Sequence, residues 1–180
     1  MKITNIFDSA RDGTFEDFIK FYNGNANEIN ENLGLNLLEL ALVNDKNGKE
    51  KIKIIQFLIS EGVDINFVDT KHRRNALHTF YFNVLSPSSE YMLLVTKLLI
   101  ENGIEINALD KYNAVPLKYA ITITKLPTEE IKHVYQYLLE HGANYNNKDI
   151  FGKSCIDYIE EYSWRNNLIE IIKEFENGNN

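Results

Sequence analysis

The sequence predicts an all-α solenoid in which helical hairpins stack side by side and β-hairpin-like turns project outward. Two blocks repeat in the same order along its 180 residues. The first block reads FLISEGVDIN at residues 57–66, LLIENGIEIN at 98–107 and YLLEHGANYN at 137–146, and a weaker copy ends at Asn30. Its last Asn therefore recurs at intervals of 36, 41 and 39 residues. The second block reads NLLELA, NALHTF, VPLKYA and SCIDYI. A period of about 20 to 50 residues is typical of repeat architectures.

The first block predicts a helix that ends at a glycine. Apolar residues at helical spacing, between residues 52 and 59 and between 93 and 100, indicate one buried face. The glycine stands where helices commonly stop with a left-handed residue, at Gly62, Gly103 and Gly142. An Asp three residues after the last Asn, at positions 69, 110 and 149, then predicts a tight turn closed by side-chain hydrogen bonds to the backbone.

The second block predicts another helix after the turn. Pro116 suits the first turn of that helix, because the N–H that proline lacks would have no helical partner there. Near the N-terminus, Thr14 and Asp17 have the spacing of a helix N-cap and its reciprocal partner. The chain is therefore expected to open with a shorter unit of the same kind.

Together the two blocks resemble the ankyrin repeat, whose pattern runs from an Asp through a Gly to Thr-Pro-Leu-His and Ala. Two units keep its spacing, through Asp110, Asn113, Pro116, Leu117 and Ala120 and through Asp149, Gly152, Ser154, Ile156 and Ile159. The unit that begins at Asp69 keeps Leu77 and His78 but has one extra residue in its turn. The resemblance implies an ankyrin-repeat solenoid, with His78 as a structural residue that bonds the neighbouring turn.

The resemblance also implies one domain over residues 1–176. Its parts are an N-terminal half-repeat cap at 3–30, repeats at 31–66, 67–107 and 108–146, and a C-terminal capping repeat at 147–176. We expect Trp164 to cover the C-terminal core and residues 177–180 to fray. The connections at 44–50, 85–90 and 124–130 are longer than the family pattern, and they either form a second irregular surface or lengthen the helices.

Composition argues against several classes of function. A net charge of −7 opposes general attraction to nucleic acid or to anionic lipid. The sequence has neither a secretory leader nor the roughly 20 apolar residues of a membrane span, so the expected location is cytoplasmic. Cys155 is the single cysteine, and no metal or other cofactor is expected. The HExxH, GxSxG and phosphate-loop motifs are absent, so we do not expect an enzyme.

In ankyrin proteins the turns line up, the inner helices form a concave face, and partners usually bind across both. The resemblance therefore implies another protein as partner, bound by a chain that is monomeric when free. The implied turn residues are Val68, Thr70, Lys71, His72, Arg73, Arg74, Leu109, Lys111, Tyr112, Lys148, Ile150 and Phe151. The concave face would add Phe82, Asn83, Thr122, Ile123, Glu161 and Tyr162.

The formal charge of the four turns is +2, which leaves −9 for all other residues. We therefore predict an acidic body with a mildly basic, aromatic row of turns. Within the protein-binding class, both an adaptor and a stoichiometric inhibitor such as an immunity protein remain open. Nucleic-acid binding through Lys71, His72, Arg73 and Arg74 is the alternative, and plain solvation of basic turn residues is the simplest interpretation.

Overall fold

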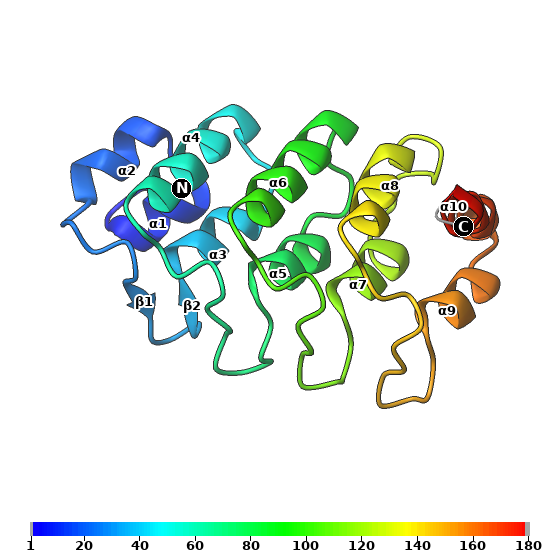
Figure 1. Cartoon of the computed structure of the whole chain (residues 1–180). Helices are drawn as coiled ribbons and strands as arrows, with labels where there is room; N and C mark the ends of the chain where they lie inside the picture. Colours follow the sequence, from blue (N-terminus) through cyan, green and yellow to red (C-terminus); the bar gives the residue numbers. More distant parts are fainter. Residues whose placement is uncertain (1, 179–180) are drawn as a thin grey trace.

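The computed structural model describes residues 2–178 and confirms the all-α solenoid (Figure 1). The elements are α1 (Ile6–Asp12), α2 (Phe15–Phe21), β1 (Ile29–Asn30), β2 (Leu35–Asn36), α3 (Leu37–Leu42), α4 (Gly48–Ser60), α5 (Ala76–Asn83), α6 (Ser89–Glu101), α7 (Pro116–Thr122), α8 (Lys132–Glu140), α9 (Cys155–Glu161), the 3₁₀ turn η1 (Ser163–Arg165) and α10 (Asn166–Gly178). Within the described part of the chain the only strands are β1 and β2, which pair antiparallel as a short hairpin.

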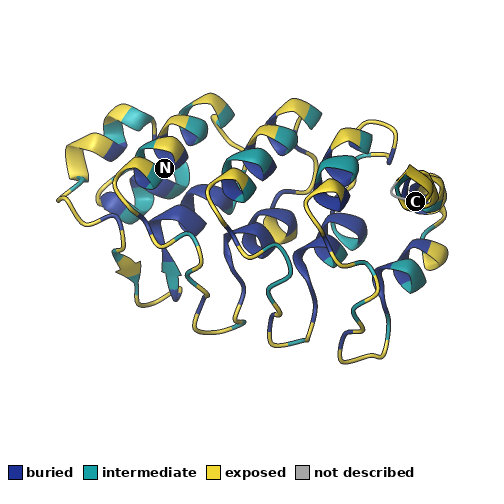
Figure 2. Cartoon of the chain, viewed as in Figure 1, coloured by how far each residue is buried: buried dark blue, intermediate teal, exposed yellow. Residues whose placement is uncertain are grey.

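The helices form two layers. The inner layer runs α1, α3, α5, α7 and α9, and the outer layer runs α2, α4, α6, α8 and α10, each helix in contact with the next in its layer. The turns all project from the same edge, at the bottom of Figure 1. The facing sides of the two layers are buried along the whole stack (Figure 2), so one elongated hydrophobic core joins all units.

Most inner helices begin with the same local device. The side chains of Asn36, Asn75 and Ser154 each accept a hydrogen bond from the backbone N–H three residues later, and the residue at that position bonds back. Such a capping box satisfies two N–H groups that the helix leaves without partners. The predicted box of Thr14 and Asp17 is present at the start of α2, and Pro116 is the first residue of α7.

The outer helices α4, α6 and α8 end as predicted, at Gly62, Gly103 and Gly142 with φ of 77°, 87° and 84°. An asparagine then joins each unit to the next. Asn66 Nδ2 donates to Gly103 O and its Oδ1 accepts from Glu105 N, and Asn107 makes the same pair of bonds to Gly142 O and Asn144 N. In the first unit this residue is Asn27, which bonds Gly62 O and Asp64 N. Asn30 is instead in β1, so the prediction that the first asparagine of the series is Asn30 is wrong.

The long connections between inner and outer helices are real loops, at residues 43–47, 84–88 and 123–131. The third loop is held by Arg165, a fully buried residue of η1. Its guanidinium donates to the carbonyl oxygens of Ile121 (2.9 Å), Thr124 (2.6 Å) and Leu126 (2.7 Å). Nothing in the local sequence pattern around Arg165 indicates that it is buried.

One expectation for the C-terminal end is wrong. Trp164 is 47% exposed and stacks on Tyr162 at a ring distance of 4.6 Å instead of covering the core, which Leu168, Ile171 and Ile172 of α10 close. Helix α10 includes residues 177 and 178 of the segment that is expected to fray. Residues 179 and 180 lie outside the described part of the chain.

Candidate partner-binding face

The residues predicted to bind a partner lie on two adjoining surfaces. The turn row comprises residues 31–34, 68–73, 109–113 and 148–152, and the inner-helix face comprises the exposed side chains at the carboxyl ends of α5, α7 and α9. Of the predicted residues, those exposed are Val68, Thr70, Lys71, Arg73, Phe82, Asn83, Leu109, Lys111, Lys148, Ile150, Phe151 and Glu161. His72, Tyr112, Thr122, Ile123 and Tyr162 are half-buried, and Arg74 is buried.

The turn aspartates are used inside the turns, as predicted. Asp69 accepts from the backbone N–H groups of residues 71, 72 and 74, and Asp110 accepts from those of residues 112 and 114. Asp149 likewise accepts from residues 151 and 153. These carboxylates are buried, whereas Lys71, Arg73, Lys111 and Lys148 are exposed. The outer surface of the row is therefore more basic than its formal charge.

Neighbouring turns are also bonded to each other. Lys111 N donates to His72 O at 2.8 Å, and Ile150 N donates to Tyr112 O at 2.9 Å. Lys71 Nζ reaches back to Asn32 O on the first turn, at 2.6 Å. Because each turn is tied to its neighbour, the row forms a continuous strip with fixed spacing.

Arg74 corrects the predicted basic patch. Its guanidinium lies 3.7 Å from the ring centroid of Phe82 and 4.8 Å from that of Tyr119, with Nε 3.7 Å from Asp110 Oδ2. The side chain is only 10% exposed, and its charged head lies over both aromatic rings. It therefore positions Phe82, which is exposed on the inner-helix face, and adds no free charge to the row.

A groove of about 270 Å³ separates the first turn from the inner-helix face. Leu33, Leu35 and Val43 line one side, and Lys71, Phe82 and Asn83 are among the residues on the other. Leu33 is exposed, although the sequence analysis did not select the first turn as a binding element. The first turn is a β-hairpin and differs from the later turns, so the alignment of the repeats did not indicate that it has an exposed apolar residue.

Beneath this groove lies a buried carboxyl group. Glu39 of α3 is fully buried, where it closes the capping box with Asn36 and accepts a hydrogen bond from Thr79 Oγ1 at 3.2 Å. Burial raises the pKa of the Glu39 carboxyl to about 8, and the nearby Asp69 carboxylate acts in the same direction. The capping function of Glu39 is readable from the sequence, but its burial is not.

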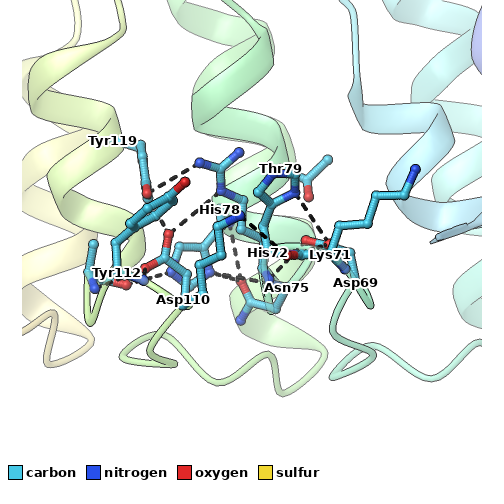
Figure 3. Close-up of polar contacts among 12 residues, drawn as sticks. Asp69, Lys71, His72, Asn75, His78, Thr79, Asp110, Tyr112 and Tyr119 are labelled. Carbon is cyan, nitrogen blue, oxygen red and sulfur yellow. Dashed lines mark hydrogen bonds and ion pairs between the residues drawn. The ribbon is translucent and has the colours of Figure 1, made fainter. Parts of the chain in front are cut away.

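His78 is a structural residue, as the resemblance implied. Its Nε2 lies 2.9 Å from Ala114 O. Its Nδ1 lies 2.8 Å from Asn75 Oδ1 and 3.3 Å from Asn75 N (Figure 3). Asn75 Oδ1 and Ala114 O both only accept, so a neutral ring can donate to one of these two oxygens. Burial lowers the pKa of His78 to about 4, which keeps the ring neutral near pH 7. Tyr119 donates to Asp110 Oδ2 at 2.5 Å beside it.

The remaining predicted residues of the inner-helix face are held by contacts within the chain. Thr122 Oγ1 donates to Lys118 O at 2.9 Å, and Glu161 pairs with Lys153. Tyr162 is the stacking partner of the exposed Trp164, so an aromatic pair stands at the C-terminal end of the face. Trp164 was assigned to the core by the sequence analysis and was therefore missed as a surface residue.

Residues 2–178 hold no cluster of three or more His, Cys, Asp or Glu side chains arranged to bind a metal ion. Cys155 is buried, and burial raises the pKa of its thiol to about 12. Over the same residues, no helix is long and apolar enough to cross a bilayer.

The stacked hairpins, the glycine stops and the bonded turns define an ankyrin-repeat solenoid, a class of protein-interaction module. The chain is 26% identical over 132 residues to ankyrin repeat protein T5 of Rabbit fibroma virus (strain Kasza), a match that covers 72% of this chain and 24% of that protein. It is 28% identical over 141 residues to palmitoyltransferase AKR1 of Candida glabrata, and this match covers 78% of this chain and 16% of the enzyme.

Both proteins match this chain through their ankyrin repeats. These matches confirm that the chain resembles the ankyrin repeat. The chain spans less than a quarter of the length of either relative. No family model matches the sequence.

Proposed function

We propose that this chain is a non-catalytic module that binds a partner protein across the turn row and the inner-helix face. The observation that carries the proposal is that three consecutive turns each expose an apolar and a cationic side chain. The pairs are Val68 with Lys71, Leu109 with Lys111, and Ile150 with Lys148. Single exposed apolar residues need no explanation, but a bonded series of them at regular spacing is what an interface uses.

The chemistry of the row favours an acidic segment as the partner. Exposed cations would meet carboxylates of the partner, while Phe151 and Phe82 supply the aromatic surface that contributes most to binding energy at interfaces. The row is rigid, so little conformational entropy would be lost when the partner binds.

A photo-crosslinking residue placed at Leu109 or Phe151 tests this proposal in cells that naturally produce the protein. The same residue at Gln56, exposed on the outer helix α4, is the matched control. We expect one protein to crosslink from both turn positions and not from Gln56. Phe151→Ala should reduce that crosslink from Leu109 by at least about tenfold, while the melting temperature stays unchanged. Equal crosslinking from Gln56, or an unaffected yield in the variant, would refute the assignment of the face.

Nucleic-acid binding is the second candidate, and the burial of Arg74 weakens it. Of the four residues in the predicted patch, Arg74 is buried against aromatic rings and His72 lies 3.6 Å from Asp69 Oδ1. Lys71 and Arg73 remain exposed. Affinity for DNA or RNA that fell steeply with salt, and was lost in a Lys71→Ala variant, would revive this function.

Within the protein-binding proposal, an adaptor and a stoichiometric inhibitor make different predictions. An inhibitor should abolish the activity of its partner at a one-to-one ratio, whereas an adaptor should leave that activity intact and bring in a third component. We propose that the protein acts in the cytoplasm and is monomeric when free. Sedimentation of the free protein and of its crosslinked complex would test the second point.

A further inference from the structure

The long connections between helices form a second hollow, at the end of the helices away from the turn row. A cavity of about 460 Å³ lies between the amino ends of α4 and α6, where the loops at 43–47 and 84–88 meet these helices. Since α4 has 13 residues and a helix rises about 1.5 Å per residue, about 20 Å separates this hollow from the turns. A partner bound to the turn row would therefore not cover this hollow.

One residue that lines the hollow has a buried polar group without a partner. Tyr91 of α6 is 9% exposed, and its hydroxyl has no hydrogen-bond partner among the described residues. An unpaired buried hydroxyl is unfavourable, so its retention calls for an explanation. Gly48 leaves room for the ring, because a Cβ at that position would lie 3.1 Å from Tyr91 Cδ2.

The lining of the hollow has two carboxylates and one lysine, a formal charge of −1. Asp45 and Glu90 line the same hollow, and neither carboxylate has an ion-pair partner within residues 2–178. Burial raises the pKa of the Tyr91 phenol, and the Asp45 carboxylate raises it further. Lys49 is the one cation of the described lining, but it is not among the groups that shift the pKa of Tyr91. The walls are apolar, formed by Ile52 and the exposed Leu94.

We propose that this hollow binds an arginine side chain of a partner protein. The methylene stem of the arginine would pack on Ile52 and Leu94, and its guanidinium would donate charge-assisted hydrogen bonds to Asp45 and Glu90. One further N–H would donate to the Tyr91 oxygen, which requires a small local opening around that oxygen because it is closed to solvent. Arginine fits better than lysine, since its planar fork of five donors can serve three acceptors at once.

Peptide titration followed by NMR tests the charge requirement. The probes are a blocked Gly-Arg-Gly peptide, the same peptide with uncharged citrulline in place of arginine, and the same peptide with glutamate. We expect saturable shifts of the amides at 45–49 and 88–94 with the arginine peptide, at least tenfold weaker binding with citrulline, and none with glutamate. Equal binding of the citrulline or glutamate peptide, or no saturable binding of the arginine peptide at millimolar concentration, would overturn the proposal.

Variants of the protein separate a specific site from general charge attraction. The pair Asp45→Asn with Glu90→Gln should weaken binding of the arginine peptide at least tenfold. The control pair Glu130→Gln with Glu140→Gln removes the same charge from exposed positions outside the hollow and the turn row and should leave the affinity unchanged. An equal loss in both pairs would mean general attraction to an acidic protein and would contradict the site.

The Tyr91→Phe variant tests the unpaired hydroxyl. The proposal expects Tyr91→Phe to weaken binding of the arginine peptide several-fold while its folded stability stays equal or rises, because an unpaired buried polar group is removed. If Tyr91→Phe binds the arginine peptide with unchanged affinity, the Tyr91 hydroxyl takes no part in the proposed site. These results do not depend on the turn row, so they can fail while the crosslinks from Leu109 and Phe151 succeed.

Discussion

Replacing Arg165 by methionine should destabilise the protein more than replacing an exposed cation of the neighbouring helix α10. Methionine keeps much of the apolar stem but cannot donate, so the carbonyl groups of Ile121, Thr124 and Leu126 lose their partners. A buried acceptor without a partner is unfavourable by about 1 kcal/mol or more. With three such carbonyls, the free energy of unfolding should fall by at least about 3 kcal/mol, which is a large part of the stability of a typical domain.

Urea unfolding followed by circular dichroism measures this loss. Hydrogen exchange should also become faster at residues 121–131, because the loop that Arg165 holds would open locally. Lys173→Met is the matched control, since Lys173 is an exposed cation on α10 and should change stability by about 0.5 kcal/mol or less. If the free energy of unfolding changes no more in Arg165→Met than in Lys173→Met, the three hydrogen bonds do not stabilise the C-terminal units.

Three further predictions concern the turns and the groove. Glu39→Gln keeps the helix cap but cannot ionise. The free energy of unfolding of the unmodified protein should therefore fall relative to Glu39→Gln as pH rises from about 4.5 to about 8, because the folded state retains a proton that the unfolded chain loses; parallel curves would mean an ordinary carboxyl. Gly34→Ala should lower stability more than Gly24→Ala, since both have positive φ but only a Cβ at position 34 would lie 2.5 Å from Thr70 Oγ1; equal melting temperatures would contradict that contact. Phe82→Ala should expose Arg74 and speed the reaction of its guanidinium with phenylglyoxal, whereas Leu85→Ala, an exposed control, should not.

Local signals in the sequence were enough for the repeating part of the fold. The glycine stops, the capping residues and the turn aspartates each act on the backbone within a few residues of themselves, and the structure has all of them where predicted. The one misplaced repeat residue, Asn30, lies in the unit whose sequence block is weakest. Its role is carried by Asn27, which is recognisable only through its bonds to the next unit.

Side chains that depend on distant neighbours could not be assigned in this way. Arg74 is nearly indistinguishable from Arg73 in the sequence, yet the first is buried between aromatic rings and the second is exposed. Trp164 looked like a core residue by its size and lies on the surface, while its neighbour Arg165 is fully buried. Neither Tyr91 nor Glu39 shows its burial in the local pattern.

The sequence by itself determined that helical hairpins repeat, which residues cap and stop most of the helices, and which edge carries the turns. These features follow from short-range hydrogen bonds and from the spacing of apolar residues. The tertiary structure alone decided which charges are free, which are covered, and where hollows form between units. Those outcomes depend on side chains about 40 positions apart that meet only when neighbouring units stack.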